Sequence, residues 1–510
     1  MSWKKEVDQI EQRRRLAKEL GGTDAVDRQH ERGRLTVRER IDGLIDQESF
    51  REVGPIAGYA ETNEDGSLKS FQPGNYVLGI AKVGGRPCVV GGEDFTQRGG
   101  SPTPAGLRKS VYAEELACKR RLPLVRFLEG GGGSVRGSGK RGPSPDPVYT
   151  THRFVSIARV LETAPVVSAA LGAVAGFPAA RLVASHFAIM TRDTAQVLIG
   201  GPALVERALG EKKTKEELGG AKVHERSSVV DAVAADENEV FNLMRGFLSY
   251  MPTNVSELPP VLDAGDDPER CEEALLAIIP RNRRRVYDAR KLVRLVVDKD
   301  SFFEMTPLFG RPQITALARL NGTPVGVVAN DPFHLGGSMT AHGAQKFRRF
   351  VRLCETFHLP ILSFVDQPGF MIGSEAESTA TIRLGMEAIS ETVRSTVPWA
   401  SVIVRKSYGV AAAAHYGPDG TVFAWPSAER GALPLEGGVA VAFRREIAEA
   451  PDPDAKRKEL EELLSKGRTP FPSADFFSVH DLIDPRRTRP ALCEWLESVQ
   501  PSMRARVTRL

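Results

Sequence analysis

The chain of 510 residues contains little cysteine, and what it contains is scattered. It has five cysteines and no Cys-x-x-Cys pair. This spacing argues against a zinc ribbon and against a disulfide framework, and it favours a reducing compartment. We therefore expect a cytoplasmic protein. The cysteines are Cys88, Cys118, Cys271, Cys354 and Cys493.

An excess of charge of one sign is also missing, as is a long apolar run. The 69 basic residues are nearly balanced by 65 acidic residues, which leaves no electrostatic signature of nucleic-acid binding. The most apolar stretch, 164–180, is interrupted by proline and glycine and is followed by Arg181. It is shorter than the roughly 20 residues that a membrane helix needs. Acidic residues near the N-terminus argue against a transit peptide. We expect neither a nucleic acid nor a membrane as partner.

The usual catalytic motifs are incomplete. The segment 134–141 resembles a phosphate-binding loop, but Ser134 occupies the place of its first glycine and Arg141 the place of its final Ser or Thr. The chain has no Gly-x-Ser-x-Gly elbow at Ser134, and its histidines show no metal-ligand spacing. No pair of acidic residues stands out as an acid–base dyad. We expect no bound metal and little catalysis by side chains.

Small residues instead follow two strand-like runs. The segment 405–415 is rich in Gly and Ala and comes after the β-branched run 400–404, and 172–180 is a similar stretch. Such a pattern predicts a helix N-terminus whose bare backbone N–H groups face a cavity and stabilise an oxyanion. The alternative is a helix whose small residues only permit close packing. Arg405 and Lys406 could meet an anionic ligand, but we expect them to be solvated at a strand end.

Both stretches belong to a long internal repeat. The segment 79–87 is similar to 316–324, Gly99-Gly100-Ser101 recurs as Gly336-Gly337-Ser338, and 121–125 recurs as 358–362. After a small gap, Gly176 corresponds to Gly409. A repeat of this length exceeds the periods of solenoid proteins and predicts two similar domains.

Strand-like and helix-like segments alternate through both halves, which predicts α/β domains with buried sheets. Thr36 and Glu39 form the pattern of a capping box at the start of a short helix. We assign residues 1–255 to an N-terminal domain, 256–285 to a linker, and 286–510 to a C-terminal domain.

A run of four glycines, Gly130 to Gly133, follows the buried strand 123–128, and Pro368-Gly369-Phe370 holds the equivalent place in the second half. Loops at the carboxyl ends of strands are where ligands bind in open α/β sheets. Glycines there let the backbone approach a ligand, although they can also serve only as turns.

Six further segments carry recognisable motifs, namely 33–42, 218–221, 329–335, 364–370, 424–429 and 443–446. In these motifs the sequence resembles the carboxyltransferase (β) subunits of biotin-dependent acyl-CoA carboxylases, the propionyl-CoA and methylcrotonyl-CoA group. The resemblance covers nearly the whole chain.

The resemblance implies two crotonase-like (ClpP-like) domains and a ring-shaped homohexamer. It implies that acyl-CoA binds mainly to the N-terminal domain and that carboxybiotin, on a separate carrier protein, enters from the C-terminal domain. The thioester enolate would attack CO₂ released from carboxybiotin. The chain has no Met-Lys-Met biotinylation motif and no ATP-grasp region. Biotin carboxylase and the biotin carboxyl carrier would therefore be separate partners.

The resemblance also assigns site residues. Gly176 and Phe177 would form one oxyanion hole for the thioester oxygen, and Val410 and Ala411 a second for the ureido oxygen of biotin. The implied substrate-binding residues are Gly131, Gly132, Gly133, Ser134, Ala175, Gly409 and Ala413. The implied biotin-binding residues are Pro368, Gly369 and Phe370.

This chain departs from the family pattern at the site. Phe177 and Val410 each replace a glycine of the usual holes, and Ala413 replaces a substrate-selective Asp. Each replacement keeps its backbone N–H. Two other functions stay open: a decarboxylase or transcarboxylase acting on a malonyl-type thioester, and a CoA-ester-binding subunit without catalysis.

Overall fold

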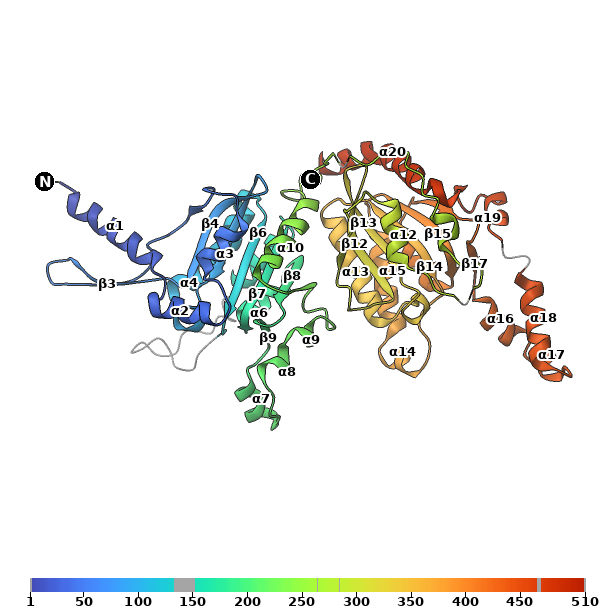
Figure 1. Ribbon diagram of the computed structural model, residues 1–510, viewed down its shortest axis with the longest axis horizontal. Coiled ribbons are helices and arrows are strands. Elements are labelled where there is room, and N and C mark those ends of the chain that lie inside the picture. The colour runs from blue at the N-terminus through green and yellow to red at the C-terminus, as the bar shows by residue number, and fades with distance from the viewer. Residues whose placement is uncertain (1, 133–151, 264, 284, 466–468, 509–510) are drawn as a thin grey trace. The chain divides into compact units, whose positions relative to one another are not determined.

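The computed structural model describes residues 2–132, 152–263, 265–283, 285–465 and 469–508. The chain forms two compact units, Met1–Glu257 and Leu258–Leu510. In each unit, helices pack on a central sheet (Figure 1). The predicted α/β class with two tandem domains is confirmed.

The sheet of the first unit has eight strands in the order β1-β4-β5-β6-β7-β8-β10, with β9 paired to β7. The pairs from β5 onward are parallel, whereas β1 with β4 and β4 with β5 are antiparallel. β2 and β3 form a separate antiparallel pair. The bounds are β1 Arg51–Glu52, β2 Gly58–Thr62, β3 Leu68–Pro73, β4 Tyr76–Val83, β5 Arg86–Glu93, β6 Leu124–Gly130, β7 Val166–Ala175, β8 Phe187–Thr191, β9 Gln196–Leu198 and β10 Ala232–Ala234.

The second unit repeats this sheet. Its order is β11-β12-β13-β14-β15-β16-β18, with β17 paired to β15. Strands β12 to β14 have the bounds of β4 to β6 moved by one constant offset, and β15 has those of β7 moved by a slightly smaller one. The repeat read from the sequence is therefore a repeat of strands. The bounds are β11 Phe303–Met305, β12 Gln313–Leu320, β13 Thr323–Asn330, β14 Ile361–Gln367, β15 Trp399–Tyr408, β16 Thr421–Ala424, β17 Glu429–Gly431 and β18 Asp481–Leu482.

Helices cover both faces of the first sheet. Successive side chains of a strand point to opposite faces, so Arg126 of β6 reaches Glu114 of α4 while Phe127 packs edge-on against Phe241 of α10, with ring centroids 5.9 Å apart. The expected capping box of Thr36 opens α3. The helices of this unit are α1 Lys4–Lys18, α2 Thr23–Glu31, α3 Val37–Leu44, the 3₁₀ turn η1 Arg98–Gly100, α4 Pro104–Arg120, α5 His152–Leu161, α6 Phe177–Val183, α7 Pro202–Leu209, α8 Lys215–Gly219, α9 Ala221–His224 and α10 Glu237–Tyr250.

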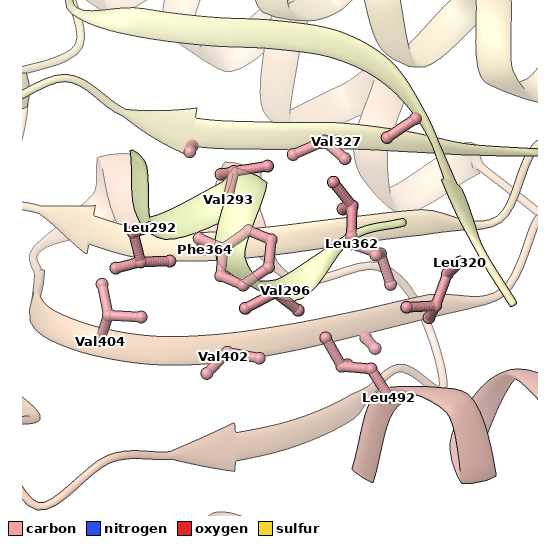
Figure 2. Packing of buried hydrophobic residues seen from close by; sticks show 14 of the residues in the cluster. Leu292, Val293, Val296, Leu320, Val327, Leu362, Phe364, Val402, Val404 and Leu492 are labelled. Carbon is pink, nitrogen blue, oxygen red and sulfur yellow. The ribbon is translucent and has the colours of Figure 1, made fainter. Parts of the chain in front are cut away.

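The second sheet is covered in the same way. Figure 2 shows Leu292 and Val296 of α12 against Phe364 of β14 and Val402 of β15, with Leu492 of α20 at one end of the cluster. These side chains are almost fully buried, and their burial stabilises the unit. The helices are α11 Leu275–Ile278, α12 Ala289–Val296, η4 Leu335–Gly337, α13 Ala341–Thr356, α14 Ser374–Ser378, α15 Thr381–Arg394, η5 Val410–His415, α16 Leu435–Ala442, α17 Arg444–Glu449, α18 Pro453–Ser465, α19 Phe471–Asp475, η6 Pro485–Arg487 and α20 Thr488–Thr508.

Candidate active site

The first glycine-containing turn lies at the carboxyl end of β7. The strand ends at Ala175, and α6 begins at Phe177. Gly176 between them has φ +64°, a conformation that other residues rarely adopt. Because Phe177 is the first residue of its helix, its N–H has no acceptor within the helix, and it donates to no other group among the described residues. An exposed turn thus carries a bare backbone donor.

The second turn has the same construction at the carboxyl end of β15. Gly409 also has φ +64°, and the 3₁₀ helix η5 begins at Val410. The first hydrogen bond of η5 runs from Ala412 N to Gly409 O, so the N–H groups of Val410 and Ala411 precede it and donate to no described acceptor. The Val410 side chain is 59% exposed, whereas Ala411 is buried. Ala413 lies exposed in the same helix.

The glycine-rich loop after β6 lies against the first turn. A Cβ placed on Gly132 would stand 2.7 Å from Gly176 Cα and 3.1 Å from Phe177 N, so only glycine fits there. Ala175 borders the same contact, with its carbonyl oxygen 2.9 Å from that position. Gly131 is half-buried with no atom close to its Cβ position. The predicted Gly133 and Ser134 lie outside the described residues.

In the second unit, the loop Pro368-Gly369-Phe370 follows β14. This strand runs parallel to β15, with Gln367 opposite Ser407. The loop and Gly409 therefore lie at the same end of the sheet, where the carboxyl ends of β14 and β15 are. The structure brings the predicted residues of this unit together at that end of the sheet.

Backbone hydrogen bonds hold this loop. Met339 N donates to Gly369 O at 3.0 Å, and Met371 N donates to Met339 O at 2.9 Å. The Phe370 ring lies on Gly385 of α15, where a Cβ would come within 2.1 Å of the ring. The loop is thus fixed on both sides.

A buried ionic cluster that the sequence did not reveal lies behind the first turn. The Glu114 carboxylate accepts hydrogen bonds from Arg126 Nη1 at 3.1 Å, Arg181 Nε at 2.9 Å and Ser156 Oγ at 2.6 Å. Arg126 Nη2 also donates to the carbonyl oxygens of Arg181 and Ala184 at the C-terminal end of α6. A cation near the C-terminal end of a helix interacts favourably with the helix dipole. The cluster therefore fixes α6, which carries the Phe177 donor.

Glu93 completes this cluster from the end of β5. Its Oε2 accepts from Glu129 N at 2.9 Å, and in the second unit Asn330 Oδ1 accepts from Asp366 N at the same distance. The first unit thus has the carboxyl group of Glu93 at the position where the second unit has the amide of Asn330. Burial raises the pKa of Glu93 to about 7, and the nearby Arg181 opposes this rise. A comparison of the two halves of the repeat could have found this residue.

The prediction that Arg405 is solvated is wrong. Arg405 is 5% exposed, and its Nε and Nη2 donate to the buried carboxylate of Asp366 at 3.0 and 2.7 Å. Lys406 N donates to Asp366 Oδ1 at 3.1 Å. Burying a charge is costly unless it is paired, and Asp366 provides the pair at the end of the neighbouring strand.

The first unit also has a buried carboxylate at the end of its central strand, and it is paired with different residues. Glu129, the counterpart of Asp366, is paired with Arg34 and Arg40 from the N-terminal helical region. The position of Arg405 is there occupied by Gly172, where a Cβ would come within 2.4 Å of Glu129 Oε1. The missing side chain leaves room for the guanidinium groups. The carboxylate at the end of the central strand is therefore neutralised in both units.

Replacing Glu93 by glutamine is expected to change how stability depends on pH. The pKa of Glu93 is higher in the folded protein than the usual value near 4.5, so the stability it contributes is fully present below that value and is lost as pH rises through about 7. The wild type should therefore lose on the order of 3 kcal/mol between pH 5 and pH 8, and Glu93→Gln should not. Calorimetric unfolding at the two pH values measures this.

Exposed Glu64 provides the control for that experiment. Glu64→Gln should leave the pH dependence of the wild type unchanged. If Glu93→Gln lost as much stability as the wild type, Glu93 would not be the titrating group.

Two kinds of feature are absent from the described residues. No helix there combines the length and the apolar character needed to cross a membrane. No group of three His, Cys, Asp or Glu side chains in these ranges is placed to hold a metal ion.

The chain is similar to known proteins along nearly its whole length. The carboxyl transferase domain family matches residues 28–509. The propionyl-CoA carboxylase carboxyltransferase subunit of Haloferax mediterranei is 34% identical over 96% of this chain and 95% of its own. The methylmalonyl-CoA decarboxylase subunit alpha of Veillonella parvula is 31% identical over 92% of this chain and 91% of its own.

A solved structure has the same fold. It is the transcarboxylase 12S hexamer with methylmalonyl-coenzyme A and methylmalonic acid bound, which is 31% identical and superposes with a TM-score of 0.87 over 97% of this chain and 95% of that one. The resemblance seen in the sequence motifs is thus confirmed by the match along the chain and by the fold. The chain belongs to the carboxyl transferase domain family.

Proposed function

We propose that the chain is the carboxyltransferase subunit of a biotin-dependent acyl-CoA carboxylase. The observation that supports this best is the matched pair of turns, at Gly176 and Gly409, each of which presents bare backbone N–H groups at the carboxyl end of equivalent strands. Two oxyanion sites suit a reaction in which two carbonyl-bearing partners take part.

In this proposal, Phe177 N–H donates to the thioester oxygen of an acyl-CoA as negative charge develops on it. A preorganised donor of this kind typically contributes a factor of about 10²–10³ to the rate. The N–H groups of Val410 and Ala411 bind the ureido oxygen of biotin. Carboxybiotin, when bound, supplies the carboxyl group that is transferred. The scheme needs no metal.

The remaining predicted residues take binding roles. Residues 1–255 form the acyl-CoA side, with Gly131, Gly132, Gly133, Ser134 and Ala175 along the thioester and coenzyme. Residues 286–510 form the carboxybiotin side, with Pro368, Gly369 and Phe370 beside biotin. Gly409 and Ala413 border the second hole.

The proposed partners are a biotin carboxylase and a biotin carboxyl carrier protein, and the proposed compartment is the cytoplasm. The proposed assembly is a homohexamer in which each site joins the N-terminal domain of one copy to the C-terminal domain of another. Its support is the transcarboxylase 12S relative, which assembles as a hexamer.

The test is ATP- and bicarbonate-dependent carboxylation of acetyl-, propionyl- and butyryl-CoA by the chain together with a biotin carboxylase and a biotinylated carrier. Carboxylation of any of these thioesters supports the proposal. No product under conditions in which the carrier is shown to be carboxylated would contradict it.

A decarboxylase is the second candidate, because a relative of similar identity is a methylmalonyl-CoA decarboxylase subunit. Release of CO₂ from methylmalonyl-CoA by the purified chain, without carboxylation in the first test, would favour it. Exchange of carboxyl groups between two thioesters would favour a transcarboxylase. Binding of CoA esters without any turnover would indicate a non-catalytic subunit.

Phe177→Gly is expected to broaden the range of acyl groups accepted. The Phe177 ring is held between the Phe154 ring, whose centroid is 5.9 Å away, and the Arg181 guanidinium at 4.3 Å. Removing the ring keeps the N–H donor and opens space for the acyl chain. In such a pocket, one methylene more or less in the substrate changes kcat/KM roughly 10–200-fold. The kcat/KM for butyryl-CoA relative to propionyl-CoA should therefore rise about tenfold.

Val410→Gly, at the equivalent position of the second unit, is the matched control for this experiment. It should leave the acyl preference unchanged, because that turn is proposed to bind biotin. An unchanged preference in Phe177→Gly would show that the ring does not border the acyl group.

A further inference from the structure

The Phe177 ring, which the proposed function places beside the acyl group, is held by one buried arginine. Phe177 and Arg181 are four residues apart in α6 and therefore share one face of the helix. The Arg181 guanidinium lies 4.3 Å from the centroid of the ring, and the Phe154 ring meets it edge-on. Phe177 is only half-buried, whereas Arg181 is 2% exposed. The ring is thus open to solvent on one side and packed against a buried cation on the other.

Arg181 is itself fixed in place. Its Nε donates to the buried carboxylate of Glu114 at 2.9 Å, and its Nη2 has no hydrogen-bond partner among the described residues. A cation is attracted to an aromatic face, and the attraction is largest where water is excluded. The Phe177 ring therefore gives a favourable electrostatic contact to a guanidinium that is not fully hydrogen-bonded. This contact holds the ring as well as the cation.

Arg181 also limits the space into which the ring could turn. A cavity of about 20 Å³ lies between α6 and the sheet, and its lining includes Phe177, Pro178, Arg181, Tyr76 and Glu93. This volume is about the room of one water molecule, so the ring cannot enter it while Arg181 is in place. Removal of the Arg181 side chain would add its volume to the cavity. The ring could then turn away from the acyl group.

The second unit has no such contact. In the repeat, Val410 stands at the position of Phe177 and Ala414 at the position of Arg181, so neither an aromatic ring nor a cation is present. The glycine before each helix nevertheless has the same φ of +64° in both units. The turn therefore forms without the arginine. This comparison favours a role for Arg181 in what the first unit binds.

We propose that Arg181 is a positioning residue for substrate specificity, which holds the Phe177 ring beside the acyl group and so restricts the site to acyl-CoA thioesters with short acyl chains. Arg181 does not touch the thioester and acts only through the ring. This inference rests on the proposed function, because it assumes that the acyl group lies beside Phe177. No bond is made or broken at Arg181.

The test is a double-mutant cycle of Arg181→Ala and Phe177→Gly in the full chain. The preference between butyryl-CoA and propionyl-CoA is measured twice, as a ratio of Kd values by isothermal titration calorimetry and as a ratio of kcat/KM values in the reconstituted assay. Arg181→Ala should shift both ratios toward butyryl-CoA by about three- to tenfold. In the Phe177→Gly background it should change them less than about twofold, because the ring is already absent. Glu114 keeps its bonds to Arg126 and Ser156 in these variants.

A purely structural role of Arg181 predicts a different pattern. If the residue only stabilised α6 and its backbone donor, Arg181→Ala would lower kcat for both thioesters alike and leave the ratios unchanged. Arg181→Lys keeps a cation but not the planar guanidinium, so it should restore part of the wild-type preference. Should Arg181→Ala fail to fold, Arg181→Met takes its place in the cycle. Methionine fills more of the space, and a shift of about twofold or more in the same direction is then expected.

Unchanged ratios in the Arg181 variant, with carboxylation intact, would overturn the inference and leave the proposed function standing. A shift that persisted in full in the Phe177→Gly background would do the same, because Arg181 would then not act through the ring. The expected shift in Kd without any carboxylation, while the carrier is shown to be carboxylated, would overturn the carboxylase proposal alone. Failure of the wild type to bind either thioester would overturn both.

Discussion

Gly176→Ala is expected to lower turnover in the reconstituted carboxylation assay by about 10²–10³-fold, the cost of one oxyanion donor, or roughly 2.7–4 kcal/mol. At φ +64°, a side chain strains the backbone, and the new Cβ would stand 2.9 Å from Gly132 Cα. The turn must shift to relieve this contact, and the Phe177 N–H shifts with it. The strands that carry the turn are buried and should remain folded, which circular dichroism checks.

Two other glycines control for strain alone. Gly66, in the turn between β2 and β3, has φ +77° with no atom near its Cβ position, so Gly66→Ala adds strain without a clash and should leave turnover unchanged. The Cβ added by Gly409→Ala would approach only Ala432 O, at 3.3 Å. This variant should therefore lower turnover less than Gly176→Ala does. Turnover close to the wild-type value in Gly176→Ala would remove the first turn from the mechanism.

The sequence predicted the strand framework well because the framework is encoded locally. Runs such as 400–404 are apolar and β-branched, and their ends are set by proline and glycine, so the repeat could be recognised residue by residue. The helix starts that follow Gly176 and Gly409 were predicted from the same local pattern. The positions of such turns are determined by residues that are close together in the sequence.

The ionic partners could not be predicted in this way. Arg405 looks like a charge at a strand end, and its burial depends on Asp366, which lies on the neighbouring strand and is far away in the sequence. Glu114 meets Arg126 and Arg181 only after a helix has packed on the sheet. Such pairs are set by strand order and helix placement, which periodicity does not specify. The buried ionic cluster around Glu114 was missed for this reason.

Asp366→Ala is expected to destabilise the second unit by about 3–5 kcal/mol, because it leaves Arg405 buried without its counter-ion. The carboxylate is fully buried and accepts hydrogen bonds from Arg405, from Lys406 N at 3.1 Å and from Tyr287 Oη at 3.2 Å. Its removal takes this acceptor away from all three donors. Urea unfolding followed by tryptophan fluorescence measures the effect, because Trp399 and Trp425 are buried in this unit.

An exposed ion pair shows why burial decides the size of this effect. Arg348 and Glu387 also form an ion pair, at 2.5 Å, but their side chains are 43% and 40% exposed. Water solvates whichever partner remains, so Glu387→Ala should cost no more than about 1 kcal/mol. The same unfolding measurement on both variants therefore compares one interaction in two environments. A loss below about 1 kcal/mol in Asp366→Ala would mean that Arg405 finds water or another acceptor once its partner is gone.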